Sequence, residues 1–222
     1  MRFVPKFGFD AFIDMRRLAA TPSPFVFDVG ANRGQTIEGL RRHFERPVIH
    51  AFEPGRDAFA ELHRCCAGMP DVVLNNVALG ARRESRIFLD NDHDEMSSFL
   101  EPSATAWGEI TGRYPVDVIT LDDYCESRGV ESIDILKIDT QGFDLQVLHG
   151  AQRLMRESAI HLVFTEVIFS EMYEGLPRFD ETYAFLADRG FAFVSFYDFY
   201  YQRDRASWTD ALFIADAFGA QR

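Results

Sequence analysis

The fold is decided by one stretch near the N-terminus, Val26-Phe27-Asp28-Val29-Gly30-Ala31-Asn32-Arg33-Gly34-Gln35-Thr36. Its first part belongs to an almost wholly apolar run, residues 25–29, which is typical of a strand buried in a parallel sheet. Residues 34–44 follow with apolar side chains at helical spacing. Gly30 permits a tight turn and Gly34 lets the helix pack closely, so the stretch predicts a strand, a ligand-binding loop and a helix.

Outward from this unit, short apolar runs alternate with helical patterns along the chain. The expected strands are 25–29, 48–52, 72–79, 86–89, 116–120, 133–138, 160–167, 191–197 and 211–215. The expected helices are 9–19, 34–44, 57–66, 121–128, 143–156 and 179–189. This alternation predicts an α/β fold whose mostly parallel sheet is covered by helices on both faces. The last two strands have no helix between them, so we expect one of them to be antiparallel.

One candidate boundary is present, at Thr21-Pro22-Ser23-Pro24, where turn-forming residues separate the first expected helix from the first expected strand. We therefore expect an N-terminal helical extension over residues 1–24 and one main domain over residues 25–222. A chain of 222 residues is long enough to bury a substantial core within a single domain of this class.

Charge and composition exclude several kinds of partner. The chain has 23 basic and 35 acidic side chains, a formal net charge of −12, which disfavours a nucleic acid or an anionic membrane surface. No stretch approaches the roughly 20 apolar residues that span a bilayer, and charged residues interrupt the N-terminal segment, unlike a signal peptide. Three cysteines and no clustered histidines indicate neither disulfides nor a metal site. We expect a soluble, cytoplasmic protein without membrane insertion.

The loop itself points to the ligand. Asn32 stands where a dinucleotide-binding loop has its second glycine, which counts against NAD or FAD. A carboxylate at the strand end, Asp28, would repel a diphosphate but suits a positively charged ligand, and the helix after Gly34 can accept that ligand's carboxylate. Glu53 ends the second strand, where an acid can bind ribose hydroxyls. S-adenosylmethionine, an amino acid with a sulfonium and an adenosine, meets all these demands.

Five segments also resemble a known family. In order they are FDVGANRGQT (27–36), AFEP (51–54), NVALG (76–80), LKIDTQGFDLQVLHGA (136–151) and TEVIFSEMYEG (165–175). Together they are similar to the FkbM-type methyltransferases, from about Phe25 to the C-terminus. The resemblance implies a Rossmann-like class I methyltransferase with a seven-stranded sheet over residues 25–222. It also implies S-adenosylmethionine as cofactor, S-adenosylhomocysteine as product and O-methylation as the usual reaction.

The resemblance further implies a set of cofactor-binding residues: Asp28, Gly30, Ala31, Asn32, Gly34, Glu53, Pro54, Asn76, Val77, Ala78, Ser98 and Asp139. One position departs from the family pattern, because the segment that usually reads Asp-x-Glu-Gly has Gln141 here. The change removes one carboxylate and leaves the role of this position open.

Candidate catalytic residues are expected at strand ends that face the cofactor. Methyl transfer needs an aligned acceptor oxygen and a base for its proton. Asp139 follows the strand 133–138, and Glu166 lies near the end of the strand 160–167. Lys137 lies inside an apolar strand, where an ammonium requires a partner, so a structural ion pair is an equally open interpretation. We expect no metal ligands.

The leading hypothesis is therefore an S-adenosylmethionine-dependent O-methyltransferase that acts on a small molecule, with a sugar, a glycolipid and a polyketide-like compound all open. Two alternatives remain: a non-catalytic scaffold that binds the cofactor, and a nicotinamide-dependent dehydrogenase. The aromatic run 191–201 exceeds what a buried strand requires. It could line an acceptor pocket, or it could form a homodimer contact.

Overall fold

A seven-stranded sheet runs through the molecule, and the computed structural model describes residues 6–219. The strands of this sheet are β1 (Phe25–Val29), β2 (Val48–Phe52), β3 (Val72–Asn75), β7 (Ile133–Ile138), β8 (Ile160–Ile168), β9 (Phe191–Gln202) and β10 (Arg205–Ala215). They lie in the order β3-β2-β1-β7-β8-β10-β9. All neighbours are parallel except β10, which is antiparallel to both β8 and β9. The predicted seven-stranded, mostly parallel sheet is confirmed.

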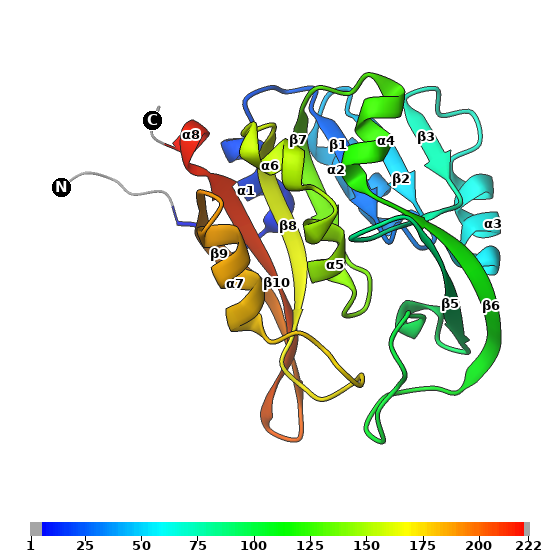
Figure 1. Cartoon of the computed structure of the whole chain (residues 1–222). Helices are drawn as coiled ribbons and strands as arrows, with labels where there is room; N and C mark the ends of the chain where they lie inside the picture. Colours follow the sequence, from blue (N-terminus) through cyan, green and yellow to red (C-terminus); the bar gives the residue numbers. More distant parts are fainter. Residues whose placement is uncertain (1–5, 220–222) are drawn as a thin grey trace.

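Helices cover both faces of this sheet, as predicted (Figure 1). Their bounds are α1 (Ala11–Leu18), α2 (Gln35–His43), α3 (Arg56–Cys65), α4 (Leu121–Arg128), α5 (Asp144–His149), α6 (Gln152–Arg156), α7 (Phe179–Ala187) and α8 (Asp216–Gly219). Apolar residues of α4 to α7 form one core cluster with the sheet, and those of α1 to α3 form another on the opposite face. Within residues 6–219, no helix has the length and apolar character that crossing a membrane requires.

The middle of the chain forms a second sheet that was not predicted. It contains β4 (Ala78–Leu79), β5 (Glu84–Asn91) and β6 (Ile110–Ile119), in the order β4-β6-β5, with the short 3₁₀ helix η1 (Asp94–Met96) after β5. The single strand expected over 72–79 is therefore wrong. The chain leaves the main sheet at Asn76, whose side-chain amide donates to the carbonyl oxygen of Glu53 at 2.8 Å, and Ala78–Leu79 then pairs with β6.

Two further expectations are corrected. The helix expected over 143–156 is two helices, α5 and α6, with a break at Gly150. A Cβ atom there would lie 2.2 Å from the carbonyl oxygen of Gly80, so this close approach ends the helix at a glycine. The strand expected over 191–197 continues to Gln202, so the aromatic run lies within β9. The hairpin β9–β10 and the pair β5–β6 extend past the main sheet at the same end (Figure 1).

The predicted N-terminal helix is present as α1, which Asp10 caps through a side-chain bond to the N–H of Ile13. It packs on the core, because Met15 and Leu18 belong to the same cluster as residues of α2 and α3. Residues 1–5 of the expected extension lie outside the described residues. The division into an extension and a domain remains a proposal.

Candidate active site

The glycine loop after β1 is held between the ends of two neighbouring strands. The backbone N–H of Gly30 donates to the carbonyl oxygen of Phe52 at 3.0 Å. A Cβ atom on Gly30 would lie 1.8 Å from the carbonyl oxygen of Asp139, so only glycine lets the loop pass this close to the end of β7. Asn32 also has a positive φ, 45°, in the region that Asn adopts more readily than most residues.

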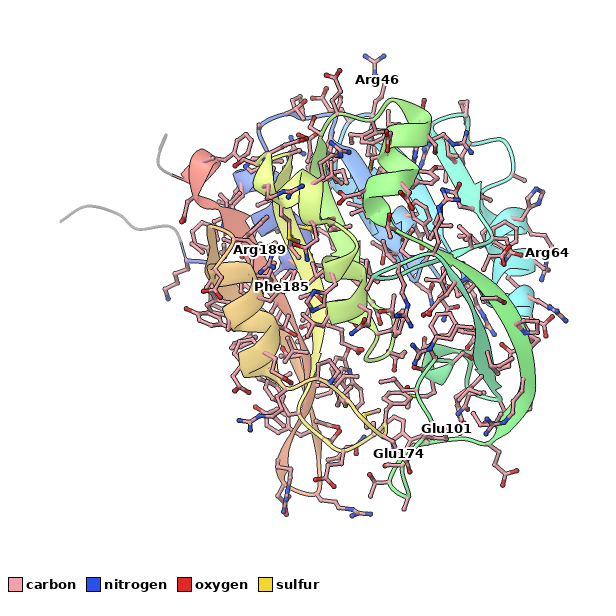
Figure 2. The ribbon with its side chains drawn as sticks, viewed as in Figure 1. Arg46, Arg64, Glu101, Glu174, Phe185 and Arg189 are labelled. Atoms are coloured by element: carbon pink, nitrogen blue, oxygen red, sulfur yellow. The ribbon has the colours of Figure 1, made fainter. Side chains whose placement is uncertain are left out.

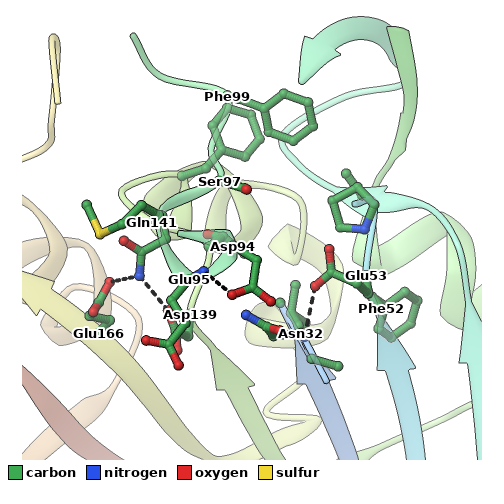
Figure 3. Close-up of a pocket in the computed structure, with 18 of the residues that line it drawn as sticks. Asn32, Phe52, Glu53, Asp94, Glu95, Ser97, Phe99, Asp139, Gln141 and Glu166 are labelled. Atoms are coloured by element: carbon green, nitrogen blue, oxygen red, sulfur yellow. Dashed lines mark hydrogen bonds between the residues drawn. The ribbon is translucent and has the colours of Figure 1, made fainter. Parts of the chain in front are cut away.

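A cavity of about 520 Å³ opens where these strands end. Ten sequence-predicted site residues line it: Gly30, Ala31, Asn32, Glu53, Pro54, Val77, Ala78, Lys137, Asp139 and Glu166. Figure 3 shows Asn32 and Glu53 on one side of this space and Gln141 and Glu166 on the other, with Asp139 between them. The prediction that strand ends bring these residues together is therefore supported by the geometry.

Four predicted cofactor-binding residues, namely Asp28, Gly34, Asn76 and Ser98, do not line the cavity. Asp28 is fully buried in β1, and Gly34 precedes α2 and packs beside Leu62. Asn76 holds the end of β2, as described above, and the Ser98 hydroxyl donates to the carbonyl oxygen of Gln141 at 2.7 Å. Direct ligand contact by these four stays a prediction, and in the structure they lie behind the residues that line the cavity.

Lys137 is a buried ammonium shared by three oxygens. Its Nζ lies 3.2 Å from Asp28 Oδ1 and 3.6 Å from Asp139 Oδ2, and it donates to the carbonyl oxygen of Gly30 at 3.0 Å. Burial disfavours the charged form, but the two carboxylates outweigh it and hold the pKa of Lys137 above its ordinary value. Lys137 therefore stays protonated, and the ion pair that the sequence left open is present.

Glu53 is a buried carboxylate at the end of β2. It accepts hydrogen bonds from the backbone N–H groups of Asn32 at 2.8 Å and Gly55 at 2.7 Å. Burial raises the pKa of Glu53 to about 7, although these two hydrogen bonds oppose the shift. Each carboxylate oxygen has a second lone pair, so Glu53 can still accept hydrogen bonds from a ligand in the cavity.

Gln141 links the two predicted catalytic carboxylates. Its Nε2 donates to Asp139 Oδ1 at 3.1 Å and to Glu166 Oε2 at 3.0 Å (Figure 3), and its Oε1 accepts from the Tyr173 hydroxyl at 2.8 Å. A neutral amide satisfies both carboxylates where a third acid would repel them. Among residues 6–219 no group of three or more His, Cys, Asp or Glu side chains is arranged to hold a metal ion.

Asp210 is a site residue that sequence reasoning missed. It lies opposite Glu166 in the antiparallel pairing of β8 and β10, and both line the cavity. Burial and then repulsion from Asp139 raise the pKa of Asp210 to about 7, and burial with the neighbouring acids raises that of Glu166 well above its ordinary value. The one signal in the sequence was an acidic residue immediately before the apolar run 211–215.

Aromatic residues line another part of the cavity. Tyr200 and Trp208 are cross-strand partners whose rings stack with centroids 4.7 Å apart, and Trp107 meets Trp208 edge-on at 5.5 Å. A roof comes from η1, where Arg33 of the glycine loop pairs with Asp94 at 2.6 Å. The irregular acidic stretch thus covers the glycine loop.

The loop after β8 also meets the segment that follows η1. Figure 2 shows Glu101 and Glu174 close together there, and the Glu174 N–H donates to the Glu101 carbonyl oxygen at 2.8 Å. This contact joins the second sheet to the main one around the cavity.

Comparisons with known proteins agree with this arrangement. A family model described as the methyltransferase FkbM domain matches residues 28–193, which is more than half of the chain. The chain is 27% identical over 169 residues to the 2-O-methyltransferase NoeI of Sinorhizobium fredii, a match that covers 71% of this chain and 69% of NoeI. It is 30% identical over 164 residues to the 31-O-demethyl-FK506 methyltransferase FkbM of Streptomyces tacrolimicus, covering 59% of this chain and 60% of FkbM.

Solved structures show the same fold at low identity. An rRNA methylase from Streptococcus thermophilus has a TM-score of 0.53 at 10% identity, covering 92% of this chain and 93% of that one. The magnesium protoporphyrin IX methyltransferase ChlM from Synechocystis, solved with bound S-adenosylmethionine, has a TM-score of 0.50 at 10% identity, with 92% and 74% coverage. These likenesses place the chain in the Rossmann-like class I fold.

Proposed function

Because this chain belongs to the family of S-adenosylmethionine-dependent methyltransferases with an FkbM domain, we propose that it methylates a hydroxyl oxygen of a small molecule. One observation carries the proposal. The cavity has a cofactor side, with the glycine loop and Glu53, and a second side where the carboxylates of Glu166 and Asp210 face each other across β8 and β10. The activities named for NoeI, a 2-O-methyltransferase, and FkbM, a 31-O-demethyl-FK506 methyltransferase, support oxygen as the acceptor atom.

The residues on the cofactor side fit S-adenosylmethionine. Glu53 can accept hydrogen bonds from ribose hydroxyls, and Pro54, Val77 and Ala78 offer an apolar surface for the adenine. The buried Oδ1 atom of Asn32 has no hydrogen-bond partner within residues 6–219, so it has a free acceptor position for a donor of the ligand.

A carboxylate on the ligand can be met at α2. Gln35 and Thr36 of its first turn line the cavity, where the positive end of the helix dipole favours a negative group.

When bound, the cofactor supplies a methyl group activated by a positive sulfur. The chain must then orient the acceptor hydroxyl and remove its proton. We assign proton removal to the carboxylates of Asp139 and Glu166, which Gln141 holds in place from one side. Lys137 acts by position: its ammonium holds Asp139 and the carbonyl oxygen of Gly30 together, and its raised pKa excludes a role as base.

The nicotinamide-dependent alternative loses its support, because the family is one of methyltransferases. The scaffold alternative is separated from catalysis by the following experiment. The protein is incubated with S-adenosylmethionine labelled with ¹³C at the methyl group and with a panel of hydroxylated small molecules. The proposed O-methylation predicts a labelled product whose ¹³C chemical shift is that of an O-methyl group. A label found on nitrogen or carbon contradicts O-methylation, and cofactor binding without any transfer supports the scaffold.

An Asp139→Asn variant measures how far the reaction depends on this carboxylate. We expect turnover to fall about 10² to 10⁴-fold, the usual contribution of a positioned base. Turnover equal to that of the unchanged protein would remove Asp139 from the mechanism.

A further inference from the structure

One side of the cavity has aromatic side chains and a carboxylate that O-methylation alone does not require. Trp107 comes from the segment between η1 and β6, whereas Tyr200 and Trp208 come from the hairpin β9–β10. A cross-strand pair such as Tyr200–Trp208 can stabilise a hairpin by itself. Trp107 adds a ring from a distant segment, and 47% of its surface and 51% of that of Tyr200 stay exposed beside the cavity. Exposed rings that converge on a cavity form a surface that a ligand can cover.

A carboxylate lies beside these rings without a donor. Asp210 lies two residues after Trp208 on β10, and within residues 6–219 its side chain has no hydrogen-bond donor and no direct ion pair, although Lys137 attracts it from farther away. Glu166, its neighbour across the sheet, has the Gln141 amide, and Asp139 has both Gln141 and Lys137. Asp210 therefore has acceptor positions that the described chain leaves open.

Acidic side chains outnumber basic ones around the cavity, although Arg33 pairs with Asp94 and burial raises the pKa of Glu53 and Asp210 to about 7. The described residues that line it include six acids, which are Glu53, Asp94, Glu95, Asp139, Glu166 and Asp210, against the single ammonium of Lys137. That ammonium is already paired with the buried carboxylate of Asp28. A phosphorylated or carboxylated acceptor would meet repulsion here, and so would a nucleic-acid backbone.

From these observations we infer that the acceptor carries a positively charged amino group beside the hydroxyl that is methylated, and that Asp210 and the rings of Trp107, Tyr200 and Trp208 bind that amino group. Aromatic faces attract cations, and a nearby carboxylate completes the recognition of an ammonium. The inference rests on the proposed function, because it assigns the acceptor side of the same cavity. It excludes neutral and anionic alcohols as preferred acceptors.

The chain contains a direct reporter of this site. It has only two tryptophans, Trp107 and Trp208, and both belong to the aromatic group, so intrinsic tryptophan fluorescence reports on this part of the cavity. Choline is a suitable cationic probe, since it has both a hydroxyl and a quaternary ammonium; that ammonium has no N–H to donate, so the probe tests attraction to the rings and to the charge of Asp210. Its matched controls are 3,3-dimethylbutan-1-ol, which has the same shape without the charge, and 3,3-dimethylbutyrate, which carries a negative charge.

The experiment titrates these three probes into the protein saturated with S-adenosylhomocysteine and follows tryptophan emission. We expect choline to bind at least about tenfold more tightly than the neutral alcohol, and the butyrate not to bind. Asp210→Asn should remove most of this preference. Asp204→Asn, which changes an exposed acid at the turn of the same hairpin, should leave it unchanged.

Each other outcome overturns the inference: equal binding of the neutral alcohol, tighter binding of the butyrate, a preference that survives Asp210→Asn, or emission that responds to none of the probes. Saturation with S-adenosylhomocysteine is checked beforehand by calorimetry. If the product binds and labelled methyl reaches oxygen but choline shows no preference, the acceptor class is wrong and the proposed function stands. If the product does not bind, the proposed function itself fails.

Discussion

Asp28 and Lys137 form an ion pair that is almost completely withdrawn from water. They are register partners on β1 and β7, with Nζ and Oδ1 3.2 Å apart. Asp28 is 0% exposed and Lys137 7% exposed, so each charge depends on the other for compensation. The sequence could place both residues in apolar strands, but it could not show that the strands pair in this register. From the sequence alone, Asp28 was therefore assigned to the cofactor, and that contact stays a prediction.

Lys137→Met should therefore destabilise the protein strongly. It leaves the carboxylate of Asp28 buried without a cation, and such a loss typically costs about 3–5 kcal/mol. The double variant Asp28→Asn with Lys137→Met removes both charges and should recover most of that loss. The free energy of unfolding in urea measures both effects. A single variant as stable as the unchanged protein would show that the pair is not needed to compensate Asp28.

Asp210 should lower stability at alkaline pH, as expected of a residue kept for binding. The pKa of its carboxyl group in the folded protein, about 7, lies above the value of about 3.9 in an unfolded chain. The folded state therefore holds the proton more tightly, so this group's contribution to stability is complete below about pH 4 and is lost as the pH rises through about 7. Because the Asp210 side chain is partly exposed, we expect this contribution to folding stability to be only about 1–2 kcal/mol.

Asp210→Asn should consequently be more stable than the unchanged protein at pH 8, and the gap should shrink toward pH 5. Unfolding in urea at the two pH values, without ligand, tests this, with Asp204→Asn, an exposed acid at the hairpin turn, as the variant that should show no such trend. The difference in stability between Asp210→Asn and the unchanged protein is measured at each pH. If this difference favoured the variant less at pH 8 than at pH 5, the assigned burial of Asp210 would be contradicted.

Among the elements, the glycine loop after β1 can be tested by comparing Gly30, which lies in it, with Gly68, which lies after α3. Gly30 and Gly68 both have positive φ, 75° and 80°, but a Cβ atom would collide with the end of β7 at Gly30 and meet nothing within 4 Å at Gly68. Gly68→Ala should cost only about 1 kcal/mol from backbone strain. Gly30→Ala should cost clearly more and weaken binding of S-adenosylmethionine. Thermal unfolding and calorimetry compare the two variants, and equal losses would refute the close approach of loop and strand.

The elements that could be predicted are those whose signal is local. The bounds of β1, β2 and β7 match the expectation because each is an apolar run ended by turn residues or acids. The break between α5 and α6 could not be predicted, since it depends on the carbonyl oxygen of Gly80, 70 residues away in sequence. The glycine loop and Glu53 were predictable because strand ends meet at one edge. Asp210 was not, because its place depends on β10 inserting between β8 and β9.

At the scale of the whole molecule, two sheets share the formation of one cavity. The main sheet supplies the glycine loop and the strand-end acids, while the second sheet and η1 supply the roof and Trp107. The net charge of −12 is partly concentrated here, since six of the acids line this space. The second sheet could not be foreseen, because β4 contains only two residues and β5 and β6 pair through an alternating pattern that is interrupted by polar residues.

The central claim is that the cofactor lies against β1 and β2 while the acceptor lies between β8, β10 and the aromatic rings. A crystal structure with S-adenosylhomocysteine bound tests it most directly. We expect the ribose on Glu53, the adenine near Val77 and Ala78, and the sulfur directed toward Asp139 and the Glu166–Asp210 pair. An adenine stacked on Trp208 and Tyr200, with Glu53 free of the ligand, would contradict it.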